Sequence, residues 1–299
     1  MVLVLAGIMI PAFVNPLAGN ADASYRSLRS MGTDAFDIHE SAPGALADNV
    51  RIAIERGARR IVVAGGDGSI GTAAAALVGS DVELAILPSG TLNHLARDLS
   101  IPLDLEEAAR LAFVGRSVPV DAASVNGRVF VNTSSVGAYV RFVRDRDRLE
   151  RHLGYHVASL VAGTRLLIRM PTVHLTLMVE GIERHYVTPL VFVGVGEREL
   201  KLPTLGARVP GGRAGLHVLV IRERSGGRTL SLALAAAARG VDAVARTPAL
   251  DAFFVESFRI GRRVKRAAMD GEIQSVVPPL EYRYLPGQLH VVVPPPAGV

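Results

Sequence analysis

Apolar and polar positions alternate between two patterns through the first 120 residues of the chain. Apolar runs typical of buried strands lie at residues 8–14, 59–66 and 82–90. Helical patterns lie at residues 45–58, 70–78, 92–99 and 103–115. In the first of these helices Leu46, Val50 and Ile54 share one face, and Gly57 is its expected end. Asp104 is the expected N-cap of the last helix. This alternation predicts a parallel sheet with helices on both faces.

After Val118 the pattern becomes that of half-buried strands. Alternating segments lie at residues 127–135, 172–181, 188–196, 215–224, 258–267 and 288–295. Helical stretches at residues 141–169 and 229–247 interrupt them. The pattern predicts a second, mostly antiparallel domain. We therefore divide the chain into domains at residues 1–120 and 121–299, and the final strand is a candidate for return to the first domain.

The composition is compatible with two folded domains and disfavours some classes of binding partner. The chain has 299 residues, of which 49% are hydrophobic, enough for two cores. A net charge of +5 does not choose between nucleotides and anionic membranes, and 5% aromatic content without Trp disfavours nucleic acid. The absence of Cys excludes disulfides, Cys-ligated zinc and a thiol nucleophile. The apolar start is interpreted as a buried strand, with a signal or anchor segment as the alternative.

Glycines surround a single carboxylate after the second apolar run, in VVAGGDGSIG (residues 62–71). Gly65, Gly66 and Gly68 permit positive φ, and their N–H groups can converge at the start of a helix that we place near Ser69. Such a loop suits phosphates, although a turn needed only for packing has the same composition. Asp67 favours phosphate chemistry, because a carboxylate beside phosphates requires a metal ion or a transferable proton between them.

Two further segments carry candidate polar groups. In PSGTLNHLARDLSIP (residues 88–102), Thr91 and Asn93 offer a hydroxyl and an amide to a nucleotide, with a helix N-cap at Thr91 as the alternative. In AAMDGEIQ (residues 267–274), Asp270 and the following glycine are typical of a β-hairpin turn. Glu272 adds a carboxylate of the kind that a general base requires.

These segments occur in the order of a known family. The ordered set NPLAG (residues 15–19), GGDGS (65–69), the block at 88–102, VDAASVNGRVFVNTSSVG (120–137) and DGE (270–272) resembles the diacylglycerol kinase catalytic-domain family. The GGDG element alone is shared with phosphofructokinases and NAD kinases, whereas the GTLN block together with DGE is more specific. The resemblance covers nearly the whole chain. It implies an α/β N-terminal nucleotide-binding domain, a mostly antiparallel β-sandwich C-terminal domain, and ATP in the cleft between them.

The resemblance also implies an activity and a set of site residues. The expected activity is transfer of the γ-phosphoryl group of ATP to a lipid hydroxyl, with diacylglycerol or a related lipid as acceptor. ATP would be contacted by Asn15, Gly19, Ser41, Gly65, Gly66, Asp67, Gly68, Ser69, Gly71, Thr91 and Asn93. Glu272 would accept the proton of the hydroxyl, with Asp67 as a rival for that role. Asp67 and Asp270 would lie near ATP-bound Mg²⁺.

The chain departs from the family pattern at an accessory metal site. Bacterial lipid kinases usually carry an aspartate in a segment that matches VPGGRAGLHVLV (residues 209–220), where this chain has Ala214. An alanine cannot bind a cation, so Asp121, the expected partner in that site, becomes a doubtful ligand. A nucleotide-binding pseudokinase is therefore one alternative function, and a kinase of a soluble substrate, such as an NAD kinase, is another.

A lipid substrate implies a cytoplasmic enzyme that docks peripherally at the inner face of the membrane. A candidate basic surface is formed by Arg141, Arg144, Arg146, Arg148 and Arg151. Acidic residues are interleaved with these arginines, so a solvated helix face is the alternative. The expected partners are ATP and a lipid but no nucleic acid, and formation of a homodimer is left open.

Overall fold

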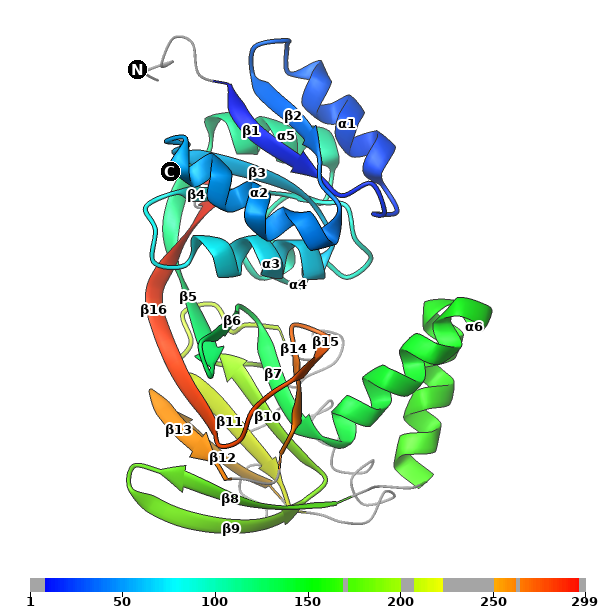
Figure 1. Cartoon of the computed structure of the whole chain (residues 1–299), viewed down its shortest axis with the longest axis vertical. Coiled ribbons are helices and arrows are strands. Elements are labelled where there is room, and N and C mark those ends of the chain that lie inside the picture. Colours follow the sequence, from blue (N-terminus) through cyan, green and yellow to red (C-terminus); the bar gives the residue numbers. More distant parts are fainter. Residues whose placement is uncertain (1–8, 169–171, 200–206, 223–249, 262–263, 296–299) are drawn as a thin grey trace. The chain divides into compact units, whose positions relative to one another are not determined.

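The computed structural model describes residues 9–168, 172–199, 207–222, 250–261 and 264–295 (Figure 1). The helix expected at residues 229–247 lies outside these ranges. The chain divides into two compact units, of which the first contains residues 1–122 and 287–299 and the second contains residues 123–286. Two strands, β5 (Arg116–Val125) and β16 (Leu280–Val293), have residues in both units.

The first unit is built on the parallel sheet that the sequence predicts. Its strands are β1 (Ile10–Val14), β2 (Phe36–Glu40), β3 (Arg60–Gly65), β4 (Glu83–Pro88) and the end of β16. They lie in the order β2-β1-β3-β4-β16, and each neighbouring pair is parallel. Continuous apolar runs form β3 and β4 because both faces of these strands are buried.

Helices cover both faces of this sheet. They are α1 (Ala21–Ser30), α2 (Pro43–Glu55), α3 (Asp67–Leu77), α4 (His94–Asp98) and α5 (Leu105–Val114). Helix α2 packs against α3, and α1 packs against α5, on the opposite side (Figure 1). In α2 the buried face is made by Leu46, Val50 and Ala53, while Ile54 is only half-buried. The chain leaves α2 at Gly57, whose φ of 84° is one that glycine adopts without strain.

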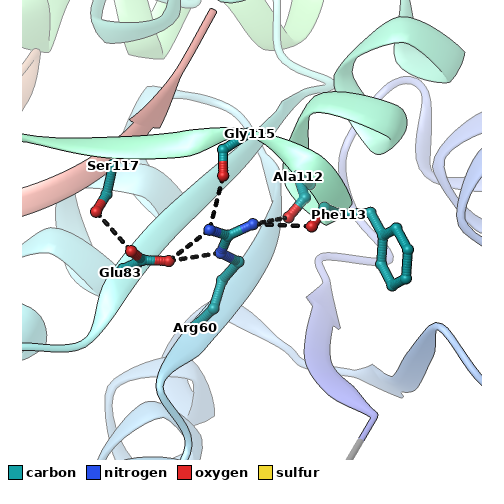
Figure 2. A network of polar contacts seen from close by, with 6 residues as sticks. All are labelled: Arg60, Glu83, Ala112, Phe113, Gly115 and Ser117. Carbon is teal, nitrogen blue, oxygen red and sulfur yellow. Dashed lines mark hydrogen bonds and ion pairs between the residues drawn. The ribbon is translucent and has the colours of Figure 1, made fainter. Parts of the chain in front are cut away.

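A partly buried ion pair connects the end of α5 to the sheet. Arg60 Nε lies 2.7 Å from Glu83 Oε2, and Ser117 Oγ donates to Glu83 Oε1 at 2.6 Å. The guanidinium also donates to the backbone carbonyls of Ala112, Phe113 and Gly115. Figure 2 shows this arrangement, in which one side chain satisfies carbonyl groups that the helix leaves unpaired. Arg60 thereby fixes the position of α5 against β3 and β4.

The second unit is a sandwich of antiparallel sheets. One sheet has the order β12-β11-β10-β7-β14-β15, and in the other β16 pairs with β13, β13 with β8, and β8 with β9. The strands not yet bounded are β6 (Arg128–Phe130), β7 (Thr133–Gly137), β8 (Val173–Val179), β9 (Ile182–Thr188), β10 (Leu190–Val195), β11 (Leu216–Ile221), β12 (Leu250–Val255), β13 (Ser257–Ile260), β14 (Arg266–Met269) and β15 (Glu272–Ser275). Side chains from both sheets form one buried core around Leu177, Val193, Val218 and Tyr282. The predicted fold class, α/β followed by antiparallel β, is confirmed.

Three hairpins of the second unit share one turn geometry. Asn126-Gly127 joins β5 to β6, Glu180-Gly181 joins β8 to β9, and Asp270-Gly271 joins β14 to β15. Both turn residues have positive φ in each case, as a two-residue type I′ turn requires. The hairpin interpretation of Asp270-Gly271 is therefore confirmed.

Helix α6 (Ala138–Ile168) follows β7 and includes most of the predicted helix at residues 141–169. Its course is broken at Gly154, which has φ 71° and ψ 163°. Among the residues that the structure describes, no helix is both long enough and apolar enough to cross a bilayer.

Candidate functional site

The carboxyl ends of the first unit's strands bring several of the predicted residues to one edge of the sheet. Asn15 follows β1, Ser41 follows β2, Gly66 follows β3 and Ser89 follows β4. The chain passes from β1 to β2 on one side and then returns to β3 on the other side of β1. In open parallel sheets, ligands bind outside the carboxyl ends of the strands at such a reversal of strand order.

Asn15 connects the two strands that flank this reversal. Its N–H donates to the Ala64 carbonyl at 2.9 Å, and its Nδ2 donates to Ser69 Oγ at 3.0 Å. Its Oδ1 accepts from the N–H of Leu17 at 2.9 Å. The loop after β1 is thus held to the first turn of α3. Gly19, at the end of that loop, has open space where a Cβ would lie.

The glycines after β3 and β4 allow two backbone turns to touch. A Cβ on Gly90 would lie 2.4 Å from the Cα of Gly66, and a Cβ on Gly65 would lie 2.5 Å from the Cβ of Ser69. The N–H of Ser89 also donates to the Gly65 carbonyl at 3.1 Å. Gly65, Gly66 and Gly68 do not adopt the positive φ that glycine permits. The loop requires glycine because of close backbone approach.

Asp67 is the first residue of α3, two residues earlier than the start predicted at Ser69. Its Oδ1 accepts the N–H of His94 at 2.7 Å, so one carboxylate joins the starts of α3 and α4. Within the described ranges, its second oxygen accepts no hydrogen bond. The side chain is half-buried, and its negative charge is favourable at a helix N-terminus. Gly68 and Gly71 continue the same helix.

Asn93 has a structural task in the loop after β4. It adopts the left-handed conformation, and it is the residue that precedes α4, in place of the Thr91 cap considered above. Its Oδ1 accepts from the Gly90 N–H at 3.1 Å, and its Nδ2 donates to the Gly90 carbonyl at 2.8 Å. Thr91 is exposed, so its hydroxyl is accessible to a ligand.

The sequence interpretation named Ser41 but missed Asn49 and Ser89, which lie near this edge. Ser41 is buried, and its Oγ accepts from Asn49 Nδ2 at 3.0 Å, so Asn49 fixes the Ser41 hydroxyl. The Ser89 hydroxyl is buried and has no hydrogen-bond partner among the described residues. Ser89-Gly90 at the end of β4 occupies a position similar to that of Gly65-Gly66 at the end of β3. This similarity is the sequence signal that could have identified Ser89.

The candidates in the second unit lie on the β14–β15 hairpin. Asp270 Oδ1 accepts from the N–H groups of Asn132 and Thr133 at 2.8 and 3.0 Å, and Oδ2 accepts from the Val131 N–H at 2.8 Å. Burial raises the pKa of the Asp270 carboxyl, while these three hydrogen bonds and the charge of Arg198 act to lower it. Glu272 begins β15, opposite Met269, and is exposed.

Asp121, the doubtful metal ligand, makes another contact. Asp121 Oδ1 accepts the N–H of Gly287 at 3.0 Å, in the first unit. Ala214 is exposed and precedes Gly215 in the second unit. In the part of the chain that the structure describes, no three side chains among His, Cys, Asp and Glu gather as they would around a metal ion.

The structure therefore assembles the predicted residues into two groups, one in each unit. Asn15, Ser41, Ser69 and the glycine turn lie at one sheet edge in the first unit, joined through Asp67 to the start of α4. Asp270 and Glu272 lie together in the second unit.

Comparison with known proteins identifies the class of the first unit. Residues 10–125 match the family model described as the diacylglycerol kinase catalytic domain. This match confirms, for residues 10–125, the resemblance to the diacylglycerol kinase catalytic-domain family that the sequence indicates.

Named relatives and solved structures extend the comparison. A probable lipid kinase YegS-like protein of Klebsiella pneumoniae is 32% identical over 191 residues, which is 61% of this chain and 63% of the relative. A protein of the same name from Cronobacter sakazakii is 36% identical over 160 residues, which is 51% of this chain and 52% of the relative. The alignments thus span between about half and just under two thirds of these relatives.

The fold match covers more of the chain. The solved structure of a diacylglycerol kinase from Bacillus anthracis str. Sterne aligns with a TM-score of 0.68 and 19% identity over 96% of this chain and 97% of that chain. Another solved structure from that organism gives a TM-score of 0.75 at 21% identity, over 96% and 98% of the two chains. At these identities the matches establish the fold.

Proposed function

We propose that the protein is an ATP-dependent lipid kinase that transfers the γ-phosphoryl group to the hydroxyl of diacylglycerol or a related lipid. The observation that carries the proposal is the glycine turn at the reversal of strand order, in the segment that matches the kinase family. The names of the two relatives, both probable lipid kinases, support a lipid as acceptor.

The first unit fits a nucleotide at the carboxyl edge of its sheet. The absence of side chains at Gly65, Gly66 and Gly90 lets the backbone approach phosphates, and the N-terminus of the eleven-residue helix α3 favours negative charge. Asn15 and Ser69 hold each other in place beside this turn. Thr91 offers an exposed hydroxyl to the nucleotide. In this proposal the chain positions the phosphates and offsets their charge, which is most of what phosphoryl transfer requires.

Magnesium fits only one of the two aspartates proposed to lie near it. Asp67 uses Oδ1 for the His94 N–H and keeps its second oxygen, which suits a cation that is bound through one or two carboxylates plus phosphates. When bound, Mg²⁺ would neutralise phosphate charge. Asp270 does not fit this role, because three N–H groups occupy three of its roughly four lone-pair positions.

We propose Glu272 as the group that accepts the proton of the lipid hydroxyl, with Asp67 as the rival. Glu272 is exposed, and its place opposite Met269 in the ladder fixes its backbone. A carboxylate in this role must come within hydrogen-bond distance of the hydroxyl during the reaction. The proposal therefore requires Glu272 to reach the acceptor when both substrates are bound.

A lipid acceptor also requires access to a bilayer, and we propose peripheral docking at the cytoplasmic face. The arginines at the start of α6 are one candidate surface. Arg144 and Arg146 each approach a neighbouring aspartate, at 3.9 and 2.8 Å, which supports the alternative of a solvated helix face. Sedimentation with vesicles of increasing anionic lipid content tests the docking proposal, and binding that is independent of anionic lipid would contradict it.

The central experiment measures transfer of labelled phosphate from ATP to a panel of lipids, with NAD included as a soluble acceptor. Label in a lipid supports the proposed function, and label only in NAD would support the NAD kinase alternative. ATP binding by calorimetry without any product would support the pseudokinase alternative, for which Ala214 is the motive.

Two variants separate the candidate bases. Glu272→Gln removes the proposed proton acceptor, and we expect kcat to fall by about 10²-fold or more. Glu183→Gln is the matched control, because Glu183 is an exposed strand carboxylate of the same unit. Wild-type turnover by Glu272→Gln together with loss of turnover in Asp67→Asn would assign the role to Asp67.

A further inference from the structure

The Asp270 side chain holds its hairpin to a segment about 138 residues earlier in the chain. Its two oxygens accept three consecutive backbone N–H groups, those of Val131, Asn132 and Thr133. Its own N–H donates to the Thr133 carbonyl at 2.8 Å. The turn therefore makes four hydrogen bonds to residues 131–133, which lead from β6 into β7.

This attachment acts on the part of the hairpin that carries Glu272. Glu272 directly follows Gly271, and its backbone position is set by the turn and by pairing with Met269. Strand β14 pairs with β7 only at Ala268 and Met269, so the ladder holds the hairpin by a short stretch. The Asp270 bonds extend this contact to the tip of the hairpin, next to Glu272.

The other two type I′ turns differ in this respect, and one of them shows that the hairpin geometry does not require such an attachment. Asn126, at the same position of its type I′ turn, also bonds a distant segment: its Nδ2 donates to the Val277 carbonyl and its Oδ1 accepts the Glu281 N–H. Among the described residues, Glu180 makes no side-chain hydrogen bond at the corresponding position. The turn itself thus forms without a clamp, and the clamp at Asp270 serves a separate purpose.

We propose that Asp270 is a positioning residue that holds the tip of the β14–β15 hairpin, and with it Glu272, against residues 131–133, and that it neither binds the metal ion nor accepts the substrate proton. The proposal rests on the proposed function, because it assigns Glu272 its position for phosphoryl transfer. It differs from the role that the family resemblance gives to Asp270.

The test compares Asp270→Asn with wild type. Asparagine suits the type I′ turn and keeps an oxygen for the Asn132 and Thr133 N–H groups, but its NH₂ group faces the Val131 N–H, donor against donor. We expect faster amide exchange at Val131 and a kcat lower by about 10- to 100-fold. The Mg²⁺ concentration for half-maximal activity should stay within about twofold. Loss of a metal ligand would instead raise that concentration by about 10- to 100-fold and overturn the proposal.

Two further measurements keep the test decisive. Glu180→Asn is the matched control at the equivalent turn position and should leave exchange at residues 131–133 and kcat unchanged. In wild type, the amide resonances of residues 131–133 should not shift when Mg²⁺-ATP is added, a result that does not depend on any variant folding. A large shift would overturn the proposal.

The outcomes also separate this proposal from the proposed function. If no lipid is phosphorylated by wild type, the function fails, and the exchange data alone still decide whether Asp270 holds the hairpin. If wild type is active and Asp270→Asn is fully active with faster exchange at Val131, the clamp exists but does not position Glu272, and the proposal fails.

Discussion

The same dipeptide, Asp-Gly, occurs in both units and has two different structures. Asp67-Gly68 starts α3, with its carboxylate half-buried and one oxygen bonded to the His94 N–H. Asp270-Gly271 forms a hairpin turn, with its carboxylate bonded to three N–H groups. The flanking patterns explain the difference, because an alanine-rich stretch of helical periodicity follows the first pair while two short apolar strands flank the second. The role of an aspartate in a motif should therefore be inferred from the hydrogen bonds that its carboxylate accepts in the structure.

The largest expected effect contrasts the two carboxylates directly. Asp67→Asn keeps an oxygen for the His94 N–H, so the free energy of unfolding should change by less than about 1 kcal/mol, while kcat for lipid phosphorylation falls by about 10²-fold or more. Asp270→Asn should instead lower the free energy of unfolding by about 1–3 kcal/mol. Chemical denaturation and labelled-ATP assays measure the two quantities. Equal stability losses in both variants would remove the distinction between the two sites.

The glycines provide the second contrast. Gly90→Ala places a Cβ 2.4 Å from the Gly66 backbone, and we expect a loss of about 3 kcal/mol in stability together with weaker ATP binding. Gly271→Ala meets no atom within 4 Å and should cost about 1–2 kcal/mol through its φ of 88° alone. Gly44→Ala, in α2 with open space around it, is the control and should be neutral or stabilising. Thermal denaturation measures the stability of each variant, and calorimetry measures its ATP binding. Wild-type stability and ATP binding in Gly90→Ala would contradict the close-approach argument.

The dependence of the free energy of unfolding on alkaline pH should report on Tyr282 in the core of the second unit. The pKa of Tyr282 is raised to about 12, because burial raises it by more than the hydrogen bond with Ser134 lowers it. A raised pKa means that the folded protein holds the phenol proton more tightly, so this contribution is present below pH 10 and is lost as the pH rises toward 12. The loss amounts to about 3 kcal/mol.

The double variant Ser134→Ala, Tyr282→Phe removes this loss without leaving a hydroxyl unpaired. Its denaturation curves should depend less on pH between 10 and 12 than those of wild type. Tyr25→Phe in the first unit is the comparison, because burial raises the pKa of Tyr25 without a buried hydroxyl partner. An unchanged pH dependence in the double variant would contradict the burial argument.

The smallest expected effect concerns an aspartate with a purely local role. Asp104 Oδ1 accepts the N–H groups of Glu106 and Glu107, which confirms it as the N-cap of α5. Asp104→Ala should cost about 1 kcal/mol and Asp104→Asn almost nothing, since both Asp and Asn are good caps. Neither should alter lipid phosphorylation. A loss of lipid phosphorylation in Asp104→Ala would show that lost stability alone can lower activity when an aspartate at a helix start is replaced. The activity loss expected for Asp67→Asn would then need no catalytic role of Asp67.

The sequence predicted what depends on local pattern. The parallel sheet, the N-cap at Asp104, the end of α2 at Gly57 and the Asp270-Gly271 hairpin all follow from periodicity and turn chemistry. The sequence could not predict the bond from His94 to Asp67, the clamp at residues 131–133 or the ion pair of Arg60, because these join groups far apart in the chain. The glycines of the first site were correctly singled out, but the positive φ that glycine permits is not used there, and Gly65 and Gly66 instead allow close contacts within and between neighbouring turns.

The last strand has a consequence for the order in which the protein can form. Residues His290 and Val291 of β16 pair with Glu83 and Leu84 of β4, so the sheet of the first unit is completed by a strand segment that is synthesised after the whole of the second unit. Until then the side of β4 is an open edge that presents unpaired backbone groups. A fragment ending at residue 122 would keep that edge exposed, so this part of the first unit should be prone to aggregate when it is produced alone.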